Sequence, residues 1–381
     1  AILRAQRQLD WQPVVVTSPK HEEFTNDVET IGGIEYHRTH WPPFSKLQAV
    51  PMVKQMAAVA ALSKQIKRLA AELRVDVIHA HSPSLNGLAV AQAAKALKLP
   101  WVYELRYYEE DAAVDRGKTR HNSLRYRLAA RMEQQALEQA DGVTTISHAL
   151  RDDLVRRGIS PEKIVEIPNG VETEFFQPCE PDAELILKYE LFQKTVIGFI
   201  GSFYFYEGLE FLIDAAVAIM THRNDIVLLL VGDGEAIEML QTRIPGQLCD
   251  RFIFTGNVPH DEVRRYYSVM DILAYPRKRS RLTELTTPLK PLEAMAMGKA
   301  IVGSDVAGIR ELFDGGNVGY LVEPENAEVL AHRLLRLVES ESERRAAGTR
   351  AREFVVQSRD WMRIVEKYFV VYGNAKNSIE Q

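Results

Sequence analysis

The chain has 381 residues, 46% hydrophobic and 26% charged, which is typical of a globular protein long enough for two domains. Its 47 basic and 52 acidic residues give a formal charge of -5, which excludes a general attraction to nucleic acid. The sequence has two cysteines, Cys179 and Cys249, which are too few for a disulfide framework and lack the spacing of metal ligands. It also has no apolar run of about 18 residues, and the two observations together predict a cytoplasmic protein.

The first half of the sequence alternates short β-branched runs with segments of helical periodicity. The runs expected to form strands lie at 12–18, 75–81, 100–105 and 142–147. Several are apolar at successive positions, as in strands that helices cover on both faces of a sheet. Ser147 can cap a following helix that ends before Gly158. This alternation predicts an α/β domain with a parallel sheet.

The same pattern restarts after a proline-containing break that ends near Pro181, where we place the linker. Runs at 195–201, 226–232, 252–256, 272–275 and 300–304 predict the strands of a second parallel sheet. From 356 to 372 the pattern is helical, and its apolar face carries Trp361, Ile364, Tyr368 and Val371. The expected domains are therefore 1–178 and 179–355, followed by a terminal helical segment at 356–381.

The sequence opens on a helical pattern at 1–11 and reaches its first expected strand at 13–16. A doubly wound domain normally begins with a strand at the centre of its sheet. We therefore expect that the complete protein has a strand ahead of this sequence, without which a sheet edge lacks its partner. The alternative is a chain that starts here after removal of an initiator methionine.

The loops after the strands carry the candidate site, because ligands of open α/β sheets bind beyond the carboxyl ends of the strands. The run at 195–201 leads through Gly201 and Ser202 to Glu207 and Gly208, where an amphipathic helix is expected. Backbone N–H groups at the start of such a helix favour phosphate binding. A simple tight turn explains the glycines equally well.

A second informative segment lies at 283–304, where Thr287 is expected to cap a helix with Pro288 in its first position. Lys290 and Glu293 are three positions apart and therefore share a face of this helix. An ammonium group and a carboxylate here suit a diphosphate and a pair of ribose hydroxyls. Taken alone, a solvated ion pair on a surface helix fits the same spacing.

Five motifs follow one another along the chain. They are IPNGVETEFF at 167–176, GFIGSFYFYEGLEFLIDA at 198–215, LLVGDGE at 229–235, FTGNVP at 254–259 and PLEAMAMGKAIVGSDVAGIRELF at 291–313. In this order they resemble family 4 of the GT-B glycosyltransferases over essentially the whole chain. The resemblance implies two Rossmann-like doubly wound domains, a cleft between them, and a C-terminal helix that crosses back to the first domain.

The resemblance also implies which residues bind the donor, a nucleotide-diphosphate sugar. It assigns Glu293 to the ribose hydroxyls, Gly201 and Ser202 to the diphosphate, and the loops at Gly232-Asp233 and Asn257-Val258 to the base. The full expected donor set is Gly201, Ser202, Gly232, Asp233, Val258, Arg281, Thr287, Pro288, Leu289 and Glu293.

The sequence departs from the family pattern in its charged positions. Family members often carry an arginine after the first glycine and a lysine before the second, where this chain has Ser202 and Glu207. We therefore nominate Lys290, with the PRKRSR run at 276–281, to neutralise the leaving diphosphate; a solvated basic loop is the alternative for that run. In the family's paired-glutamate pattern Leu285 takes the first place, and Glu284 lies one position away.

Candidate residues of the first half lie at the ends of two expected strands. His79 and His81 share one face by alternation, and His81 lies at the carboxyl tip; for His79 a structural role is the simpler interpretation. Arg106 stands where many family members have a histidine, and these variants resemble the subgroup of bacterial exopolysaccharide and exosortase systems. For Asn169-Gly170, a plain turn and a role in lining the cleft are both open.

The resemblance implies a glycosyltransferase that retains the anomeric configuration, and we expect its catalytic residues to be Lys290, Glu284, Arg106 and His81. No D-x-D motif is present, so we expect no metal or other cofactor, and the charge of the diphosphate is met by Lys290 and a helix N-terminus. The expected partners are a nucleotide-sugar donor and a glycan or lipid-linked acceptor, in exopolysaccharide or cell-surface glycan synthesis, and no nucleic acid.

Two other functions stay open. A nucleotide-sugar epimerase on the same fold would need paired acid and base carboxylates, and a non-catalytic nucleotide-sugar-binding partner would tolerate the altered charged positions. For the apolar and basic segment at 45–74, an ordinary core-facing helix with a solvated basic side is the simpler interpretation, and contact with anionic lipid at the inner face of the membrane is the alternative.

Overall fold

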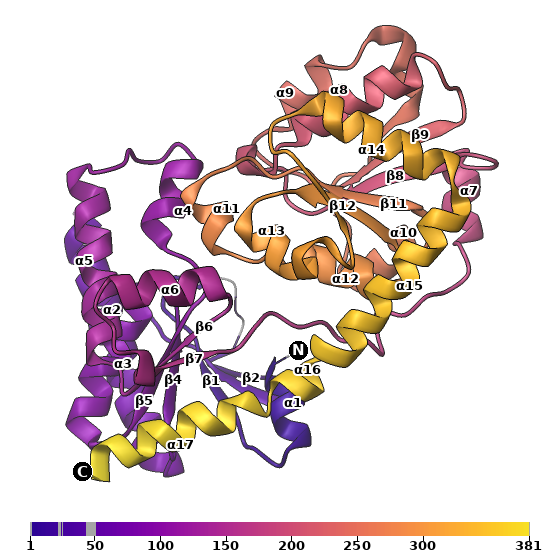
Figure 1. Cartoon of the computed structure of the whole chain (residues 1–381). Helices are drawn as coiled ribbons and strands as arrows, with labels where there is room; N and C mark the ends of the chain where they lie inside the picture. The colour runs from indigo at the N-terminus through magenta and orange to yellow at the C-terminus, as the bar shows by residue number, and fades with distance from the viewer. Residues whose placement is uncertain (1, 22–23, 25, 43–50, 381) are drawn as a thin grey trace. The chain divides into compact units, whose positions relative to one another are not determined.

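The computed structural model describes residues 2–21, 24, 26–42 and 51–380. The chain forms two compact units, one from Ala1–Pro168 together with Trp361–Gln381 and one from Asn169–Asp360 (Figure 1). The second unit begins ahead of the boundary expected at residue 178, because Val171 and Phe176 are buried in its core. Each unit is an α/β domain with parallel strands, as the alternating runs predict.

The described part of the first unit contains two sheets. Strands β4 (Ile78–His81), β5 (Trp101–Leu105), β6 (Gly142–Thr145) and β7 (Ile164–Glu166) form a parallel sheet in that order. In the other sheet, β3 (Ile34–His37) lies between β1 (Val14–Val16), which is parallel to it, and β2 (Val28–Ile31), which is antiparallel.

The hairpin of β2 and β3 is absent from our expected strands, although the sequence carries its signal. Gly32 and Gly33 separate two short apolar-polar runs and have φ angles of 59° and 78°. Two residues with positive φ form the tight turn that suits the twist of a hairpin.

The helices of the first unit are α1 (Ile2–Gln8), α2 (Pro51–Leu73), α3 (Ser84–Leu97), α4 (Glu109–Asp115), α5 (Leu124–Gln139), α6 (His148–Arg156), α16 (Trp361–Ile364) and α17 (Lys367–Glu380). Ser147 caps α6 as predicted, since its side chain accepts a hydrogen bond from the N–H of Leu150. Across the described residues, no helix combines the length and apolar character that crossing a membrane requires.

Residues 361–381 of the C-terminal segment are part of the first unit. The single helix expected at 356–372 is divided, because α15 ends at Ser358 and the next residues pair with Val171, which bridges to Asp360 and whose N–H donates to the Arg359 carbonyl (2.9 Å). The apolar face predicted for this segment is confirmed by a cluster buried together with Val102 and Ile167. Its members are Trp361, Ile364, Tyr368 and Val371.

The second unit has one parallel sheet with the order β10-β9-β8-β11-β12-β13. Its strands are β8 (Thr195–Ile200), β9 (Ile226–Val231), β10 (Phe252–Phe254), β11 (Ile272–Tyr275), β12 (Ala300–Ser304) and β13 (Tyr320–Val322). The first strand, β8, lies between β9 and β11, so the strand order reverses beside it. Ligands of such folds bind at the carboxyl ends of the strands at this reversal.

Helices cover both faces of this sheet (Figure 1). They are α7 (Ala183–Lys188), α8 (Leu209–Met220), α9 (Ile237–Thr242), α10 (Val263–Val269), α11 (Arg281–Leu285), α12 (Lys290–Ala296), α13 (Ala307–Leu312), α14 (Ala327–Glu339) and α15 (Glu341–Ser358). The central strands β8 and β9 are almost entirely buried, in agreement with their continuous apolar runs.

Candidate functional site

Loops after β8, β9 and β10 meet beyond the carboxyl ends of these strands. The N–H of Gly232 donates to the carbonyl of Gly256 (3.0 Å), which joins the second loop to the third. A Cβ atom on Gly232, whose φ is 132°, would lie 1.9 Å from the carbonyl oxygen of Gly201. The close contact between the loops after β8 and β9 therefore requires glycine at position 232. Three further expected donor residues lie in these loops: Ser202 and Asp233 are exposed, and Val258 is half-buried.

Lys290 and Glu293 share a face of α12 as predicted, with the lysine Nζ 3.3 Å from both carboxylate oxygens. They are not a solvated surface pair, because Glu293 is only 8% exposed. A Cβ atom on Gly201 would lie 3.9 Å from Cγ of Lys290, so the lysine side chain lies over the loop that follows β8. The structure thus brings together three of the predicted donor and catalytic residues.

Two buried tyrosines hold the first turn of α12 in place. The hydroxyl of Tyr267 donates to Oε2 of Glu293 (3.0 Å), and that of Tyr275 donates to the backbone carbonyl of Lys290 (3.1 Å). Burial, reinforced by the Glu293 carboxylate, holds the pKa of both tyrosines well above its usual range, so both remain hydrogen-bond donors. Sequence patterns do not single out these tyrosines, which look like ordinary core residues.

The segment ahead of α12 corrects an expectation. Thr287 does not cap this helix; α12 begins at Lys290, with Leu289 as the preceding residue and Pro291 in its first turn. The Thr287 hydroxyl instead accepts a hydrogen bond from Nδ2 of Asn169 (3.1 Å), which also donates to the Thr287 carbonyl (2.8 Å). The buried side chain of Asn169 therefore holds Thr287, ahead of α12, through two hydrogen bonds. Pro288 is half-buried and Leu289 is exposed.

Glu207, at the position where the family often has lysine, forms a buried ion pair with Arg277. The guanidinium donates through Nε to Oε2 (3.0 Å) and through Nη2 to Oε1 (2.6 Å), and each side chain is 10% exposed. Beside this pair Gly208, with φ 68°, approaches the carbonyl of Pro276 so closely that a Cβ atom would lie 2.1 Å away. Arg277 therefore fixes the loop ahead of α8, and because it is buried the solvated-loop alternative is wrong for this residue.

Other members of the basic run are also paired. Lys278 forms an ion pair with Glu210, and Nε of Arg279 lies 3.1 Å from Oε1 of Glu284. Oε2 of Glu284 accepts a hydrogen bond from the N–H of Ala307 at the start of α13 (2.8 Å). Arg281 is half-buried at the start of α11. The carboxylate of Glu284 thus has partners on both oxygens within the second unit.

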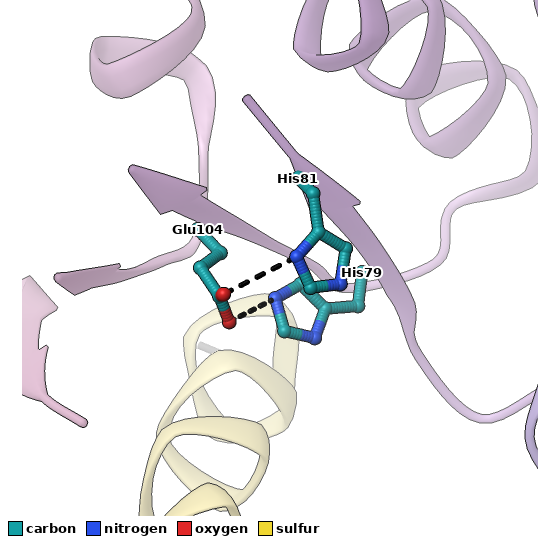
Figure 2. A group of neighbouring side chains, drawn as sticks. All are labelled: His79, His81 and Glu104. Atoms are coloured by element: carbon teal, nitrogen blue, oxygen red, sulfur yellow. Dashed lines mark ion pairs between the residues drawn. The ribbon is translucent and has the colours of Figure 1, made fainter. Parts of the chain in front are cut away.

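His81 ends β4, Arg106 follows β5, and both share one partner in the first unit, Glu104. Figure 2 shows His79 and His81 on the same side of Glu104. Nδ1 of His81 lies 3.2 Å from Oε1 of Glu104, and Nη1 of Arg106 donates to the same oxygen (3.0 Å). Glu104 is buried, and burial alone would raise its pKa. The neighbouring His81, His79 and Arg106 nevertheless hold the pKa of this carboxyl well below its usual range.

Helix α17 closes the other side of this cluster. The hydroxyl of Tyr368 donates to Oε2 of Glu104 (2.6 Å), and that of Tyr372 lies 2.8 Å from Nδ1 of His79. Burial, with the charge of His81 second, lowers the pKa of His79 to about 3, so this imidazole is neutral at physiological pH. Its contacts agree with the structural role expected for His79.

His79, His81 and Glu104 each offer a ligand atom, and these atoms lie within 4.8 Å of one another. The chemistry of the set does not favour a divalent cation, because Glu104 already has its charge balanced by Arg106 and accepts a hydrogen bond from Tyr368. The two imidazole rings are also stacked, 17° from parallel, so their lone pairs do not converge on one point. We therefore read the cluster as a network of hydrogen bonds and ion pairs.

Glu104 is the functional candidate that sequence patterns missed. It is a carboxylate inside the strand sequence WVYEL, and its register partner on the neighbouring strand is His81. A single charge in a run that is otherwise apolar or aromatic is a usable signal, since such a charge is almost always paired when buried.

Comparison with known proteins gives matches over both units. A model described as a glycosyl transferase 4-like domain matches residues 1–170, and one described as glycosyl transferases group 1 matches residues 194–340. An uncharacterised glycosyltransferase of Methanocaldococcus jannaschii is 26% identical to this chain over 257 residues. The match covers 67% of this chain and 64% of that protein, so the chain spans less than two thirds of the length of this relative.

Solved structures with the same architecture include two whose match extends over most of both chains. Sucrose-phosphate synthase from Thermosynechococcus elongatus has a TM-score of 0.77 at 23% identity, covering 98% of this chain and 91% of that one. Anabaena HepE in complex with UDP-glucose has a TM-score of 0.69 at 21% identity, covering 88% and 84%.

Proposed function

Because the chain is a glycosyltransferase with the GT-B fold, we propose that it moves a sugar, with retention, from a nucleotide-diphosphate donor to a hydroxyl of a glycan or lipid-linked acceptor. The observation that carries the donor part is the Lys290–Glu293 pair, which is held by Tyr267 and lies beside the glycine loops. The UDP-glucose in the HepE structure supports a nucleotide sugar as the donor class.

In this proposal Glu293 accepts hydrogen bonds from the two ribose hydroxyls, as a carboxylate with four acceptor sites can. Lys290, which faces Glu293 in the present structure, then has the diphosphate as its partner. Gly201 and Ser202 contact the diphosphate, and the loops at Gly232 and Val258 contact the base. No group of the chain is required as a metal ligand.

The proposed step is same-face attack. A bond forms between the acceptor oxygen and the anomeric carbon, while the bond from that carbon to the diphosphate oxygen breaks. The leaving phosphate oxygen takes the proton of the acceptor hydroxyl. Negative charge on the diphosphate grows during this step, so a cation beside it stabilises the transition state more than the bound donor.

We further propose that the acceptor belongs to exopolysaccharide or other cell-surface glycan synthesis at the inner face of the membrane. The start of α2 supports this, because Met52, Val53 and Met56 are exposed there. Lys54, with its Nζ 5.0 Å from the centroid of the Trp41 ring, adds a cation to the same end of the helix.

The experiment that tests the donor proposal is a thermal-shift screen of UDP-, GDP- and ADP-sugars. A bound donor raises the melting midpoint by mass action, and we expect one nucleotide to do so. Turnover with added acceptor supports transfer, and a new sugar nucleotide formed without acceptor indicates an epimerase. Donor binding without turnover against any acceptor indicates a non-catalytic partner.

Glu293→Gln is expected to weaken binding of that donor by about 1–3 kcal/mol, because a charged acceptor of ribose hydrogen bonds becomes a neutral amide. Calorimetry of the donor with wild type and variant measures the change. Glu184→Gln is the matched control, since Glu184 is an exposed partner of Arg265 in the same unit. Unchanged affinity in Glu293→Gln would remove Glu293 from the donor site.

Lys290→Ala is expected to lower kcat more than donor affinity, because the lysine meets charge that develops as the glycosidic bond breaks. Steady-state kinetics and calorimetry on the same preparations separate the two effects, with EDTA present because the proposal needs no metal. Equal losses in kcat and affinity would assign Lys290 to binding alone.

A further inference from the structure

The register of the sheet places His81 directly opposite Glu104. β4 and β5 are parallel neighbours in which His81 pairs with Glu104, and both residues lie at the carboxyl ends of their strands. The result is a contact of 3.2 Å between Nδ1 of the imidazole and Oε1 of the carboxylate. His81 is 44% exposed, whereas Glu104 is 3% exposed, so the pair has one buried and one accessible member.

The charge state of Glu104 decides which nitrogen of His81 carries the proton. An ionised carboxylate offers acceptors only, so the nitrogen that faces it must donate. In neutral His81 the proton therefore lies on Nδ1, and Nε2 keeps its lone pair. Figure 2 shows this second nitrogen turned away from the carboxylate.

Glu104 itself has little freedom to turn. Tyr368 donates to Oε2 (2.6 Å) and Arg106 to Oε1 (3.0 Å), which holds the carboxylate from two sides. The ring of His79 stacks on that of His81 with 4.5 Å between centroids, and its Nε2 lies 3.5 Å from Oε2 of Glu104. A ligand-facing group whose neighbours fix its orientation is preorganised for binding.

We infer that Glu104 is a positioning residue: it fixes His81 as the Nδ1–H tautomer, so that Nε2 accepts a hydrogen bond from a hydroxyl of the sugar or lipid-linked acceptor. This inference rests on the proposed function for the identity of the ligand. The tautomer itself follows from the contacts of the first unit alone.

The tautomer is measured directly by long-range ¹H–¹⁵N spectra of protein labelled with ¹⁵N-histidine, recorded over a range of alkaline pH. We expect His81 of the wild type to carry its proton on Nδ1. Glu104→Met is expected to move the proton to Nε2, because no acceptor then faces Nδ1, and Glu104→Asp to keep it on Nδ1. His81→Gln identifies the resonances.

A second histidine-glutamate pair of the first unit, His148 with Glu166, provides the control. Glu166→Gln is expected to change the spectrum of His148 and leave that of His81 unaltered. A proton on Nε2 of His81 in the wild type, or no change in Glu104→Met, overturns the inference. If Glu104→Met does not fold, the wild-type spectrum and Glu104→Asp decide.

The kinetic consequence is separate from the spectrum. In Glu104→Met the KM for the acceptor is expected to rise about tenfold, the effect of one lost hydrogen bond, while the KM for the donor is unchanged. An equal change in both constants would assign Glu104 a general structural role. Failure of the wild type to transfer sugar would count against the proposed function and leave the tautomer result standing.

Discussion

Arg277→Met is expected to lower the free energy of unfolding of the second unit by about 3–5 kcal/mol. The substitution keeps most of the side-chain volume and removes the charge, so the carboxylate of Glu207 is left buried without its cation. The pair is 10% exposed on each side and is joined by two hydrogen bonds, so water cannot replace the lost partner. Urea unfolding monitored by circular dichroism measures the change.

Two variants make this test specific to burial. Arg265→Met removes an arginine that also pairs with two carboxylates, Asp182 and Glu184, but is 36% exposed, and it is expected to lower the free energy of unfolding much less. Combining Arg277→Met with Glu207→Leu removes both buried charges and is expected to recover much of the loss. An Arg277→Met effect no larger than that of Arg265→Met would show that water reaches the Glu207 pair.

Glu133→Gln is expected to remove a pH dependence from the stability of the first unit. Glu133 is buried on α5 and accepts a hydrogen bond from the Tyr103 hydroxyl (2.5 Å). Burial, aided by the charge of Glu110, raises the pKa of Glu133 to about 7, although Tyr103, Arg157 and the backbone near Ser84 offset part of the rise. The native state therefore holds this proton more tightly than the unfolded chain.

The sign and size of the effect follow from linkage. Below the unfolded pKa of 4.5 both states are protonated, and stability is lost as the pH rises toward the folded pKa of about 7. The difference between these two values corresponds to about 3 kcal/mol. The gap in free energy of unfolding between wild type and Glu133→Gln should therefore move by about this amount, in favour of the variant, from pH 4 to pH 8.

Urea unfolding at several pH values across this range measures the gap. Glu138→Gln on the same helix is the control, because Glu138 is exposed and its carboxylate accepts a hydrogen bond from Gln134, one helical turn earlier. The gap in free energy of unfolding between Glu138→Gln and wild type should be the same at every pH. Parallel curves for Glu133→Gln and wild type would contradict the raised pKa.

Local patterns predict most of the fold and much less of the site. The buried strands, the Ser147 cap and the apolar face around Tyr368 follow from period and capping chemistry, which depend on neighbouring residues. The spacing of Lys290 and Glu293 likewise predicts a shared face. It does not predict that Glu293 is buried, because its partner Tyr267 lies on another helix.

The corrections have the same physical origin. Thr287 is a good cap by local rules, but its hydroxyl is occupied by Asn169, which lies 118 positions earlier. Arg277 sits in a run that favours a solvated or anion-binding loop, and the acid that neutralises it is 70 positions away. In each case a distant partner outweighs the local preference, and one sequence gives no measure of such pairings.

The return of α16 and α17 to the first unit sets the order in which the chain can fold during synthesis. The second unit is continuous from Asn169 to Asp360, so all of its residues are synthesised before Trp361 and the helices that follow it. The core of the first unit includes Trp361, Tyr368 and Val371, and the Glu104 cluster lacks a hydrogen bond until Tyr368 arrives. Although domains usually fold from the N-terminus onward, here the core of the first unit is completed only after the whole second unit has been synthesised.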